Sequence, residues 1–410
     1  MLFQRLCFLL LFLVFSSQLD ALTLAEALKL SFAHLAMRTA DLEVSKTHVG
    51  LKDIGKHPRD GLAVEIENFS GRMKGFSESE VTLAWKRPLL NGRQTKVKRD
   101  FAELAIAAAG LEKERLRWEI SANVQASFHK ALSMFQLLEN AREVASISGA
   151  FLAIAKARVE AGAGPGREIL KAELEFNRAA LDVKRLEGKA AEAITSLTRE
   201  IGVENLPETN LVGTLIVDID LPEISKLQAN ISTFHPSVRA VDLQLHDATL
   251  KQKQLKVDTR PTYDIEAGIR NFRSDDSHAF IFGIETTLPN RKAFVGAVEA
   301  SAIEKDRLLI EKERVIREIF QLLDEEVKKF FASRQTARDL NLKIIPASAK
   351  VLDMALEGYR LGKTDQLVVL EARKAHAEVL RELLFAVSDL YEAVDSIEKL
   401  SGICLVGEHH

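Results

Sequence analysis

The sequence repeats itself once, at an offset of about 200 residues, and this repeat limits the folds open to the chain. Gly162 stands opposite Gly362, His34 opposite His235, and residues 195–202 opposite residues 395–402. Chance similarity between helical segments would not give matches in the same order along both halves. We therefore expect two copies of one structural plan, at 22–202 and 222–402, with a connector at 203–221 and a C-terminal tail at 403–410.

Each half is expected to contain a helix, two strands, a very long helix, a tight break and a last helix. The predicted elements of the first half are a helix at 24–56, strands at 61–70 and 80–90, a long helix at 93–160 and a helix at 167–201. Those of the second half are a helix at 222–257, strands at 262–271 and 278–288, a long helix at 291–360 and a helix that ends at Leu400. At 1.5 Å per residue each long helix would measure about 100 Å. The two shorter helices of a half would stack end to end beside it.

The last helix has apolar residues on a strict seven-residue repeat, which indicates a coiled-coil seam. The seam consists of Leu380, Val387 and Val394 at one position and Leu383, Leu390 and Ile397 at the other. Such a seam is most often packing between helices, and it does not identify a substrate.

The four predicted strands alternate between apolar and charged residues. The apolar side includes Leu83, Trp85, Ile265, Phe280 and Phe282. The opposite side carries Glu65, Glu67, Lys86, Asp264, Glu266, Arg270 and Glu285. Alternation of this kind also fits an ordinary sheet packed on a core. Strands of about ten residues match a tilted transmembrane strand, however, and no other element is left to cover the apolar side, so we expect it to face lipid.

Four strands cannot close a barrel alone, because about eight are needed. Open strand edges are not tolerated in lipid, so they must pair with other copies of the chain. Two copies would give eight strands and a filled interior, and three would give twelve strands and a water-filled lumen. The residues alone do not choose between these two assemblies.

The first 21 residues have the features of a secretory signal peptide. Arg5 supplies a positive charge, residues 6–15 are wholly apolar, and Ala21 follows a short polar stretch. Ten apolar residues are too few to span a bilayer, and no later run approaches the length of a transmembrane helix. The formal charge of −3 argues against a nucleic-acid partner, and Cys7 and Cys404 are too far apart in sequence for a CxxC site.

Nothing in the sequence indicates catalysis. The ten histidines are scattered, apart from the terminal His409 and His410. There is no phosphate-binding loop, no nucleophile elbow and no cluster of Cys and His. The glycine-rich segment 162–166 lacks the preceding strand that a phosphate loop needs, so a tight turn is the better interpretation. We expect no enzyme activity, no metal site and no cofactor.

Several segments resemble the TolC-type outer-membrane efflux duct family, and together they cover essentially the whole mature chain in both repeats. One is the helix-opening LTLAEAL at 22–28. Others are KRPLLNGR at 86–93, its counterpart LPNR at 288–291, and the turn segments RVEAG at 158–162 and GYRLGK at 358–363. The closing LSG at 400–402 fits as well. Each motif is weak alone, but their order across two repeats is specific.

The resemblance implies a mainly α-helical fold with a small β part. In this fold three chains complete a 12-stranded barrel in the outer membrane, and long helical hairpins form an α-barrel in the periplasm. It implies a homotrimeric exit duct that works with a periplasmic adaptor protein and an inner-membrane pump of the resistance-nodulation-division type. The modest length and the LNGR segment look most like the heavy-metal branch of cobalt–zinc–cadmium and copper ducts. The lipid-anchoring cysteine of several relatives is absent.

Other functions remain open at this point. The duct could serve a multidrug pump or a type I protein secretion system. More remote alternatives are an exported coiled-coil structural protein, an adaptor or an envelope enzyme. An adaptor would have one hairpin, a coiled coil would not need strand pairs, and an enzyme would need a site.

The resemblance also places the gate and the adaptor contact at the helix–helix turns. The residues concerned are Arg158, Gly162, Gly164, Arg167, Tyr359, Arg360, Gly362, Lys363 and Asp365. Solvated charges beside ordinary turns are the simpler interpretation. Pro346 lacks a backbone donor and should kink the second long helix, and Gly149 lies at a comparable distance from the first turn. We therefore expect both positions to act as helix hinges.

Overall fold

The computed structural model describes residues 22–56, 60–68, 78–89, 91–162, 165–203, 211–215, 217–289 and 291–405. The predicted signal peptide, Gly164, residues 204–210 and 216 of the connector and the end of the tail lie outside these residues. The chain forms two compact units, and each unit draws on both sequence repeats. Of the described residues, one unit takes those from 22 to 38, within 115–235 and from 317 to 405, and the other takes those within 39–114 and 236–316. The compact units therefore cut across the repeats, because the long helices belong to both.

The second unit contains one antiparallel sheet with the strand order β1-β2-β3-β4. The strands are β1 Gly61–Glu67, β2 Glu80–Pro88, β3 Thr262–Phe272 and β4 Ser277–Thr287. Their bounds agree with the predicted strands to within a few residues. The pairing of β2 with β3 joins the two sequence repeats, so the two predicted strand pairs form a single sheet.

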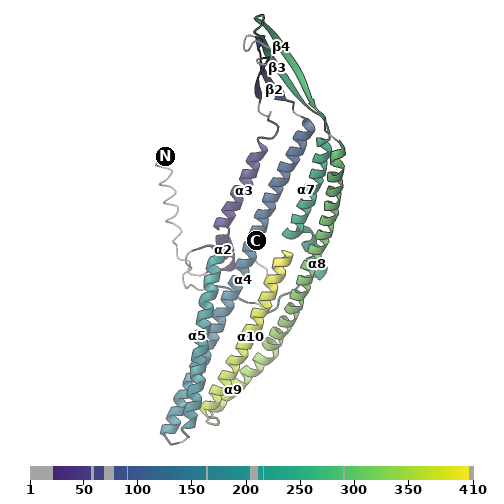
Figure 1. The fold of residues 1–410 in the computed structure, drawn as a ribbon. Coiled ribbons are helices and arrows are strands. Elements are labelled where there is room, and N and C mark those ends of the chain that lie inside the picture. The colour runs from purple at the N-terminus through teal and green to yellow at the C-terminus, as the bar shows by residue number, and fades with distance from the viewer. Residues whose placement is uncertain are drawn as a thin grey trace, which may run out of the picture. The chain divides into compact units, whose positions relative to one another are not determined.

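Four helices of this unit stand next to one another (Figure 1). They are α3 Leu35–Leu51, α4 Gly92–Glu160, α7 Pro236–Asp258 and α8 Val295–Asp339. Asp41 of α3 pairs with Lys113 of α4 at 2.5 Å, and Asp242 of α7 pairs with Lys312 of α8 at 2.6 Å. Glu114 of α4 also pairs with a side chain of α7, Arg239. The order of the helices is therefore α3-α4-α7-α8, with α3 and α8 on the outside.

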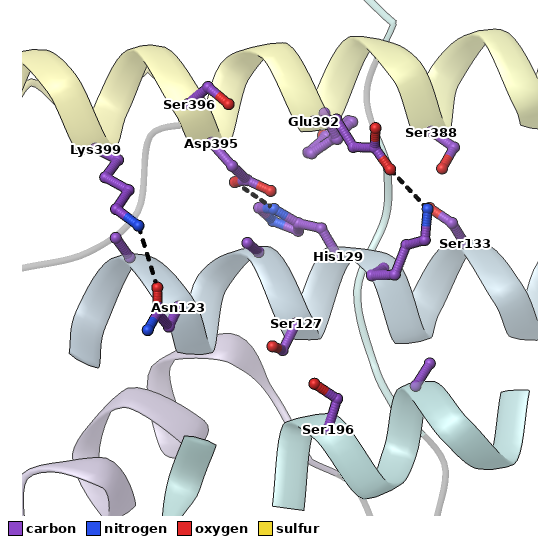
Figure 2. A pocket seen from close by; sticks show the side chains of 15 residues that line it. Asn123, Ser127, His129, Ser133, Ser196, Ser388, Glu392, Asp395, Ser396 and Lys399 are labelled. Carbon is purple, nitrogen blue, oxygen red and sulfur yellow. Dashed lines mark hydrogen bonds and ion pairs between the residues drawn. The ribbon is translucent and has the colours of Figure 1, made fainter. Parts of the chain in front are cut away.

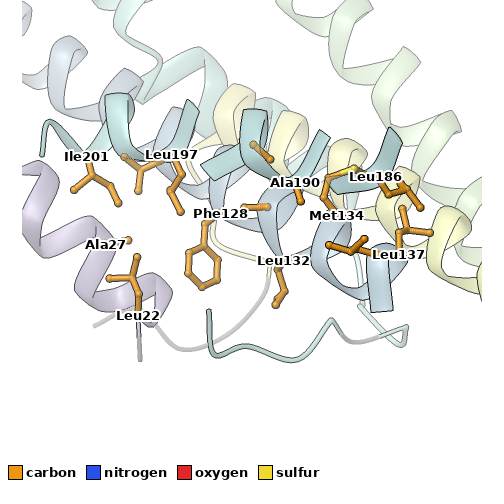
Figure 3. Packing of buried hydrophobic residues seen from close by; sticks show 14 of the residues in the cluster. Leu22, Ala27, Phe128, Leu132, Met134, Leu137, Leu186, Ala190, Leu197 and Ile201 are labelled. Carbon is orange, nitrogen blue, oxygen red and sulfur yellow. The ribbon is translucent and has the colours of Figure 1, made fainter. Parts of the chain in front are cut away.

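The first unit packs the remaining helices around a hydrophobic core. They are α2 Leu24–Ser31, α5 Arg167–Ile201, α6 Ile224–Phe234, α9 Ile345–Arg360 and α10 Gln366–Ser401. Figure 3 shows the part of this core where α2, α4 and α5 meet, with Ala27, Phe128 and Leu197 among the buried side chains. The seam predicted for the last helix is buried at its C-terminal half, where Val387, Leu390, Val394 and Ile397 lie in the interior.

Two predicted helices are each divided in two, and our prediction of single helices was wrong. The helix predicted at 24–56 breaks between α2 and α3, where the Nδ1 atom of His34 accepts a hydrogen bond from the backbone N–H of Ala36. The helix predicted at 222–257 breaks between α6 and α7. There Pro236 forces the preceding His235 out of the helical region, to φ −60° and ψ 129°.

The first long helix is continuous over Gly92–Glu160, as predicted to within one residue. The second is interrupted, which corrects the single helix predicted at 291–360. It opens with a 3-10 turn at Arg291–Phe294 and contains a π-helical turn, η3, at Leu340–Ile344. The π turn ends just before Pro346, whose ring would clash with a carbonyl one turn earlier in a regular α-helix. The wider turn removes that clash, which is the physical reason for the interruption.

Candidate functional site

The sequence predicted that apolar and charged side chains lie on opposite sides of the sheet. The strand register of the structure places them on opposite faces. Directly paired residues share a face, and Leu83 pairs with Ile269, which in turn pairs with Phe280. All five predicted apolar residues lie on this face, together with Leu62, Val64, Ile66 and Ile284. Phe280 is 92% exposed and Phe282 is 75% exposed. A large apolar surface therefore has no cover among the described residues of the chain.

The opposite face carries the seven predicted charged residues, and the structure adds Glu80, which the sequence reasoning missed. Lys86 lies 3.4 Å from Glu266 and 3.9 Å from Glu285. Arg270 lies 3.4 Å from Glu67 and 3.3 Å from Glu80. The described strands place six acidic and two basic side chains on this face, so acidic groups remain in excess after pairing.

The turn between α9 and α10 is a Schellman motif. The backbone N–H of Lys363 donates to the carbonyl of Gly358 at 2.8 Å, and that of Gly362 donates to the carbonyl of Tyr359 at 3.0 Å. Gly362 has φ +68°, a conformation that glycine adopts without strain. Gly162 has φ +70° at the corresponding point of the first repeat. Both glycines thus have a positive φ, and each donates its backbone N–H to the carbonyl three residues earlier, Val159 or Tyr359.

Among the described residues, one ion pair connects the two turn regions. Arg158, near the end of α4, lies 3.1 Å from Asp365, the residue before α10. Both side chains are partly exposed. Arg167, Tyr359, Arg360 and Lys363 are exposed, and Arg360 has no ion pair among the residues that the structure describes. Of the predicted turn charges, the structure therefore brings together Arg158 and Asp365.

The two predicted hinge positions differ in their surroundings. Pro346 is the second residue of α9, and Ile345 alone separates it from the π turn. Gly149 lies within the regular α-helix α4, where an added Cβ would come 3.3 Å from the ring of Phe176 on α5. Close packing of the two helices is therefore a sufficient reason for glycine at 149.

A polar cluster that the sequence reasoning did not find lies between α4 and α10 (Figure 2). The Nδ1 atom of His129 is 2.8 Å from the carboxylate of Asp395, and both residues are buried. Gln125 donates to the same carboxylate at 3.2 Å and also to Glu398. The ring of His129 stands edge-on to Tyr391, with centroids 4.7 Å apart. The visible signal was the presence of Asp395 and Glu398 beside the apolar seam of the last helix.

This cluster borders a cavity of about 480 Å³ between α4, α5 and α10. The cavity is lined mainly by hydroxyl groups and by paired charges, with Lys130 only 2.6 Å from Glu392. Burial raises the pKa of the Asp395 carboxyl, and the hydrogen bond from His129 acts in the opposite direction. The contact of His129 with Asp395 joins α4 to α10 inside the helical packing.

The described residues contain neither a candidate metal site nor a candidate membrane-spanning helix. No group of three or more His, Cys, Asp or Glu side chains within these ranges is arranged to hold a metal ion. No helix in the described part of the chain has both the length and the apolar character needed to cross a membrane.

No protein-family model matches the chain. Among curated proteins it is similar to protein CyaE of Bordetella pertussis, with 26% identity over 284 residues. That match covers 65% of this chain and 58% of CyaE. The chain is also similar to the cobalt-zinc-cadmium resistance protein CzcC of Cupriavidus metallidurans, with 21% identity over 391 residues. This match covers 93% of this chain and 90% of CzcC.

Solved structures share the fold over nearly the whole chain. The outer-membrane channel OprN matches with a TM-score of 0.71 at 16% identity, covering 92% of this chain and 89% of OprN. CusC, solved in a study of transmembrane channel formation, matches with a TM-score of 0.71 at 16% identity, covering 92% of this chain and 91% of CusC. The predicted fold, long helical hairpins with a small four-stranded sheet, is thereby confirmed.

Proposed function

We propose that this chain, which has the fold of the TolC-type outer-membrane efflux ducts, is the outer-membrane exit duct of a tripartite efflux system. Its role is passive conduction of substrates from the periplasmic side to the outside, without catalysis of its own. The helical part lies in the periplasm, and the sheet lies in the outer membrane. The duct works as a homotrimer with a periplasmic adaptor protein and an inner-membrane pump of the resistance-nodulation-division type.

The observation that carries this proposal is the four-stranded sheet. Its apolar face is exposed, and its outer strands β1 and β4 have no strand partner among the described residues. Lipid is the environment in which an apolar face of this kind is stable, and it does not tolerate open strand edges. Three copies would join their edges into twelve strands around one pore, with Glu65, Asp264 and the other charged residues of the opposite face lining the lumen.

Metal cations are the substrates that we propose. Similarity to CzcC over 93% of this chain supports this choice, and so does the excess of acidic groups on the charged face of the sheet. The turns at Gly162 and Gly362, with Arg158, Arg167, Arg360 and Asp365 beside them, form the proposed gate and adaptor contact. In this proposal Pro346, and also Gly149, let the last turns of the long helices move.

The test is to purify the full-length protein from outer membranes in mild detergent and to measure its native mass and its conductance in planar bilayers. We expect a stable trimer that forms discrete channels. A monomer or dimer at several protein concentrations, without channels, would contradict the proposal. Phe282→Lys places a charge on the apolar face and should sharply reduce recovery from the outer membrane, whereas Glu65→Lys on the opposite face should not.

A further inference from the structure

The connector between the two sequence repeats is held to the first repeat at residues 211–215. Leu211 forms a parallel β-bridge with Leu22, and the backbone N–H of Val212 donates to the carbonyl of Leu22 at 3.0 Å. The side chains of Leu211 and Leu215 pack against the hydrophobic core where α2, α4 and α5 meet. This part of the connector is therefore fixed to the first repeat.

Three residues beyond Leu215, two arginines of α8 hold the connector to the second repeat. Arg334 lies 3.4 Å from Asp218 and 2.9 Å from Asp220, and Arg338 lies 3.2 Å from Asp218. These four charged residues form the connector clamp, and all of them belong to the first unit. An extended chain spans only about 3.5 Å per residue, so the connector ties the first repeat closely to α8.

The charges of the connector clamp depend on one another. Arg334 and Arg338 are four residues apart on one helix, where two like charges repel. Asp218 pairs with both and offsets that repulsion. The side chain of Arg334 is only 16% exposed, and its guanidinium lies over the ring of Phe330, 5.9 Å from the centroid. A charge so far removed from water needs its carboxylate partners, so loss of those carboxylates would release the connector from α8.

The connector clamp lies directly before the π turn of the second long helix. Arg338 is two residues before Leu340, where the π turn begins, and Arg334 is six residues before it. A π turn inside an α-helix often lies at a functional site. Beyond it, α9 is joined to α10, with the hydroxyl of Ser348 2.8 Å from the Nδ1 atom of His376. The helix is thus fixed to the connector on one side of the π turn and to α10 on the other.

We propose that Arg334 and Arg338 are positioning residues for the gate. The connector clamp fixes α8 directly before the π turn, so that α9 and α10 move about a stationary α8. This inference rests on the proposed function, because it takes the turns at Gly162 and Gly362 to be the gate. It adds the fixed point against which the second turn moves. A loosened clamp would let α8 follow α9, and the closed arrangement would be held less firmly.

The first measurement tests whether the carboxylates hold the connector. The paired variant Asp218→Asn with Asp220→Asn removes both charges at nearly unchanged side-chain size. Thermolysin cleaves before accessible apolar residues, and Ile219 is buried in the parent protein. Cleavage at Ile219 in the detergent-purified full-length protein, mapped by mass spectrometry and divided by the rate for the unfolded chain, should be at least tenfold faster in the variant. The matched control is Glu311→Gln, which removes a carboxylate paired with Arg314 on α8 itself.

The second measurement tests whether the connector clamp acts through the π turn. Single-channel recordings in planar bilayers give the resting open fraction, which the paired variant should raise severalfold. Pro346→Ala removes the ring that the π turn accommodates. Combined with the paired variant, it should give an open fraction severalfold different from the product of the two separate effects, because both changes act on one element. Glu311→Gln should leave the open fraction unchanged, alone and with Pro346→Ala.

Exchange of the charges keeps the inference testable if the paired variant fails to fold. Arg338→Asp alone sets a second carboxylate against Asp218 and should speed cleavage at Ile219. Addition of Asp218→Arg restores an opposite pair at the same place, while Arg334 keeps Asp220, and should recover most of the parent's protection. A double variant cleaved as fast as Arg338→Asp alone would contradict the contact.

Three outcomes would overturn the inference while the proposed duct stands, provided that the parent protein forms channels. If Ile219 stays protected in the paired variant, the carboxylates do not hold the connector. If the connector loosens but the open fraction stays that of the parent, the clamp serves the fold alone. The same conclusion follows if the effects of the clamp and of Pro346→Ala simply multiply. A parent protein that forms no channels contradicts the proposed function first, and this inference with it.

Discussion

His129 on α4 lies 2.8 Å from the buried carboxylate of Asp395 on α10, and this contact links the two helices. Other charged groups lie at the edge of the cluster, including Glu398, Lys130 with Glu392, and Lys399. A carboxylate taken out of water is tolerated only when charge or hydrogen bonds compensate for the lost hydration. Removal of the imidazole would leave Asp395 with the amide of Gln125 as its hydrogen-bond donor among the described residues.

We predict that His129→Ala lowers the free energy of unfolding by about 3–5 kcal/mol at pH 7, as expected for a buried charge that loses its partner. Burial raises the pKa of Asp395 above its ordinary value of 3.8, so stability from this carboxyl is present below that value and lost as the pH rises through the raised pKa. The destabilisation by His129→Ala should therefore shrink toward acid pH. Denaturant unfolding followed by circular dichroism at several pH values measures both effects.

The control for this prediction is the double variant His129→Ala with Asp395→Asn. The amide carries no charge, so part of the lost stability should return at neutral pH and the pH dependence should flatten. If the double variant is as unstable as the single variant at every pH, the effect comes from lost packing against Tyr391, 4.7 Å away between ring centroids, and not from the buried charge.

At the scale of elements, the two long helical segments differ in how they approach their turns. α4 reaches Gly162 as a regular helix, whereas the second passes from α8 through the π turn at Leu340–Ile344 into α9. The contact between the turn regions is the ion pair of Arg158 with Asp365, which is partly exposed and therefore contributes only about 0–1 kcal/mol. A contact this weak suits a closure that must open, especially when it is repeated in each copy.

We predict that Arg158→Ala and Asp365→Ala each raise the resting conductance of the isolated channel severalfold. The matched control is Arg360→Ala, because Arg360 is a cation on a neighbouring turn with no ion pair among the described residues. Single-channel recordings in planar bilayers measure the resting state. If all three variants conduct as the parent does, with the oligomer intact, the ion pair does not hold the gate and the turns serve adaptor contact only.

At the scale of the whole molecule, the charged face of the sheet would determine which ions the assembled pore prefers. Lys86 and Arg270 each lie between two carboxylates, and acidic groups remain in excess on each chain. Repetition around a ring would multiply this excess, and rings of carboxylates concentrate cations.

We predict a cation-preferring pore, measured as the reversal potential across a salt gradient. Asp264→Asn with Glu65→Gln should reduce that preference severalfold, because neither carboxylate has an ion pair among the described residues. Glu266→Gln, which removes a partner of Lys86, serves as a comparison within the same face. Anion preference of the parent protein would contradict the proposed facing of the sheet.

The sequence by itself determined the features that depend on local pattern. Alternation along each strand assigned residues to faces, the absence of proline predicted the length of α4, and the repeat at Gly162 and Gly362 predicted two equivalent turns. Each of these signals is set by neighbours along the chain, through the periods of strands and helices and the conformations open to glycine.

Only the tertiary structure decided which distant residues meet. The pairing of β2 with β3, the contact of Arg158 with Asp365 and the burial of His129 against Asp395 each join residues far apart in sequence. No local period encodes such pairs, because they depend on how strands pair and how helices pack in three dimensions. The break at His34 is of the same kind, because the helical pattern continues through it in the sequence. At Pro346 the sequence predicted a kink, and the structure decided its form, a π turn.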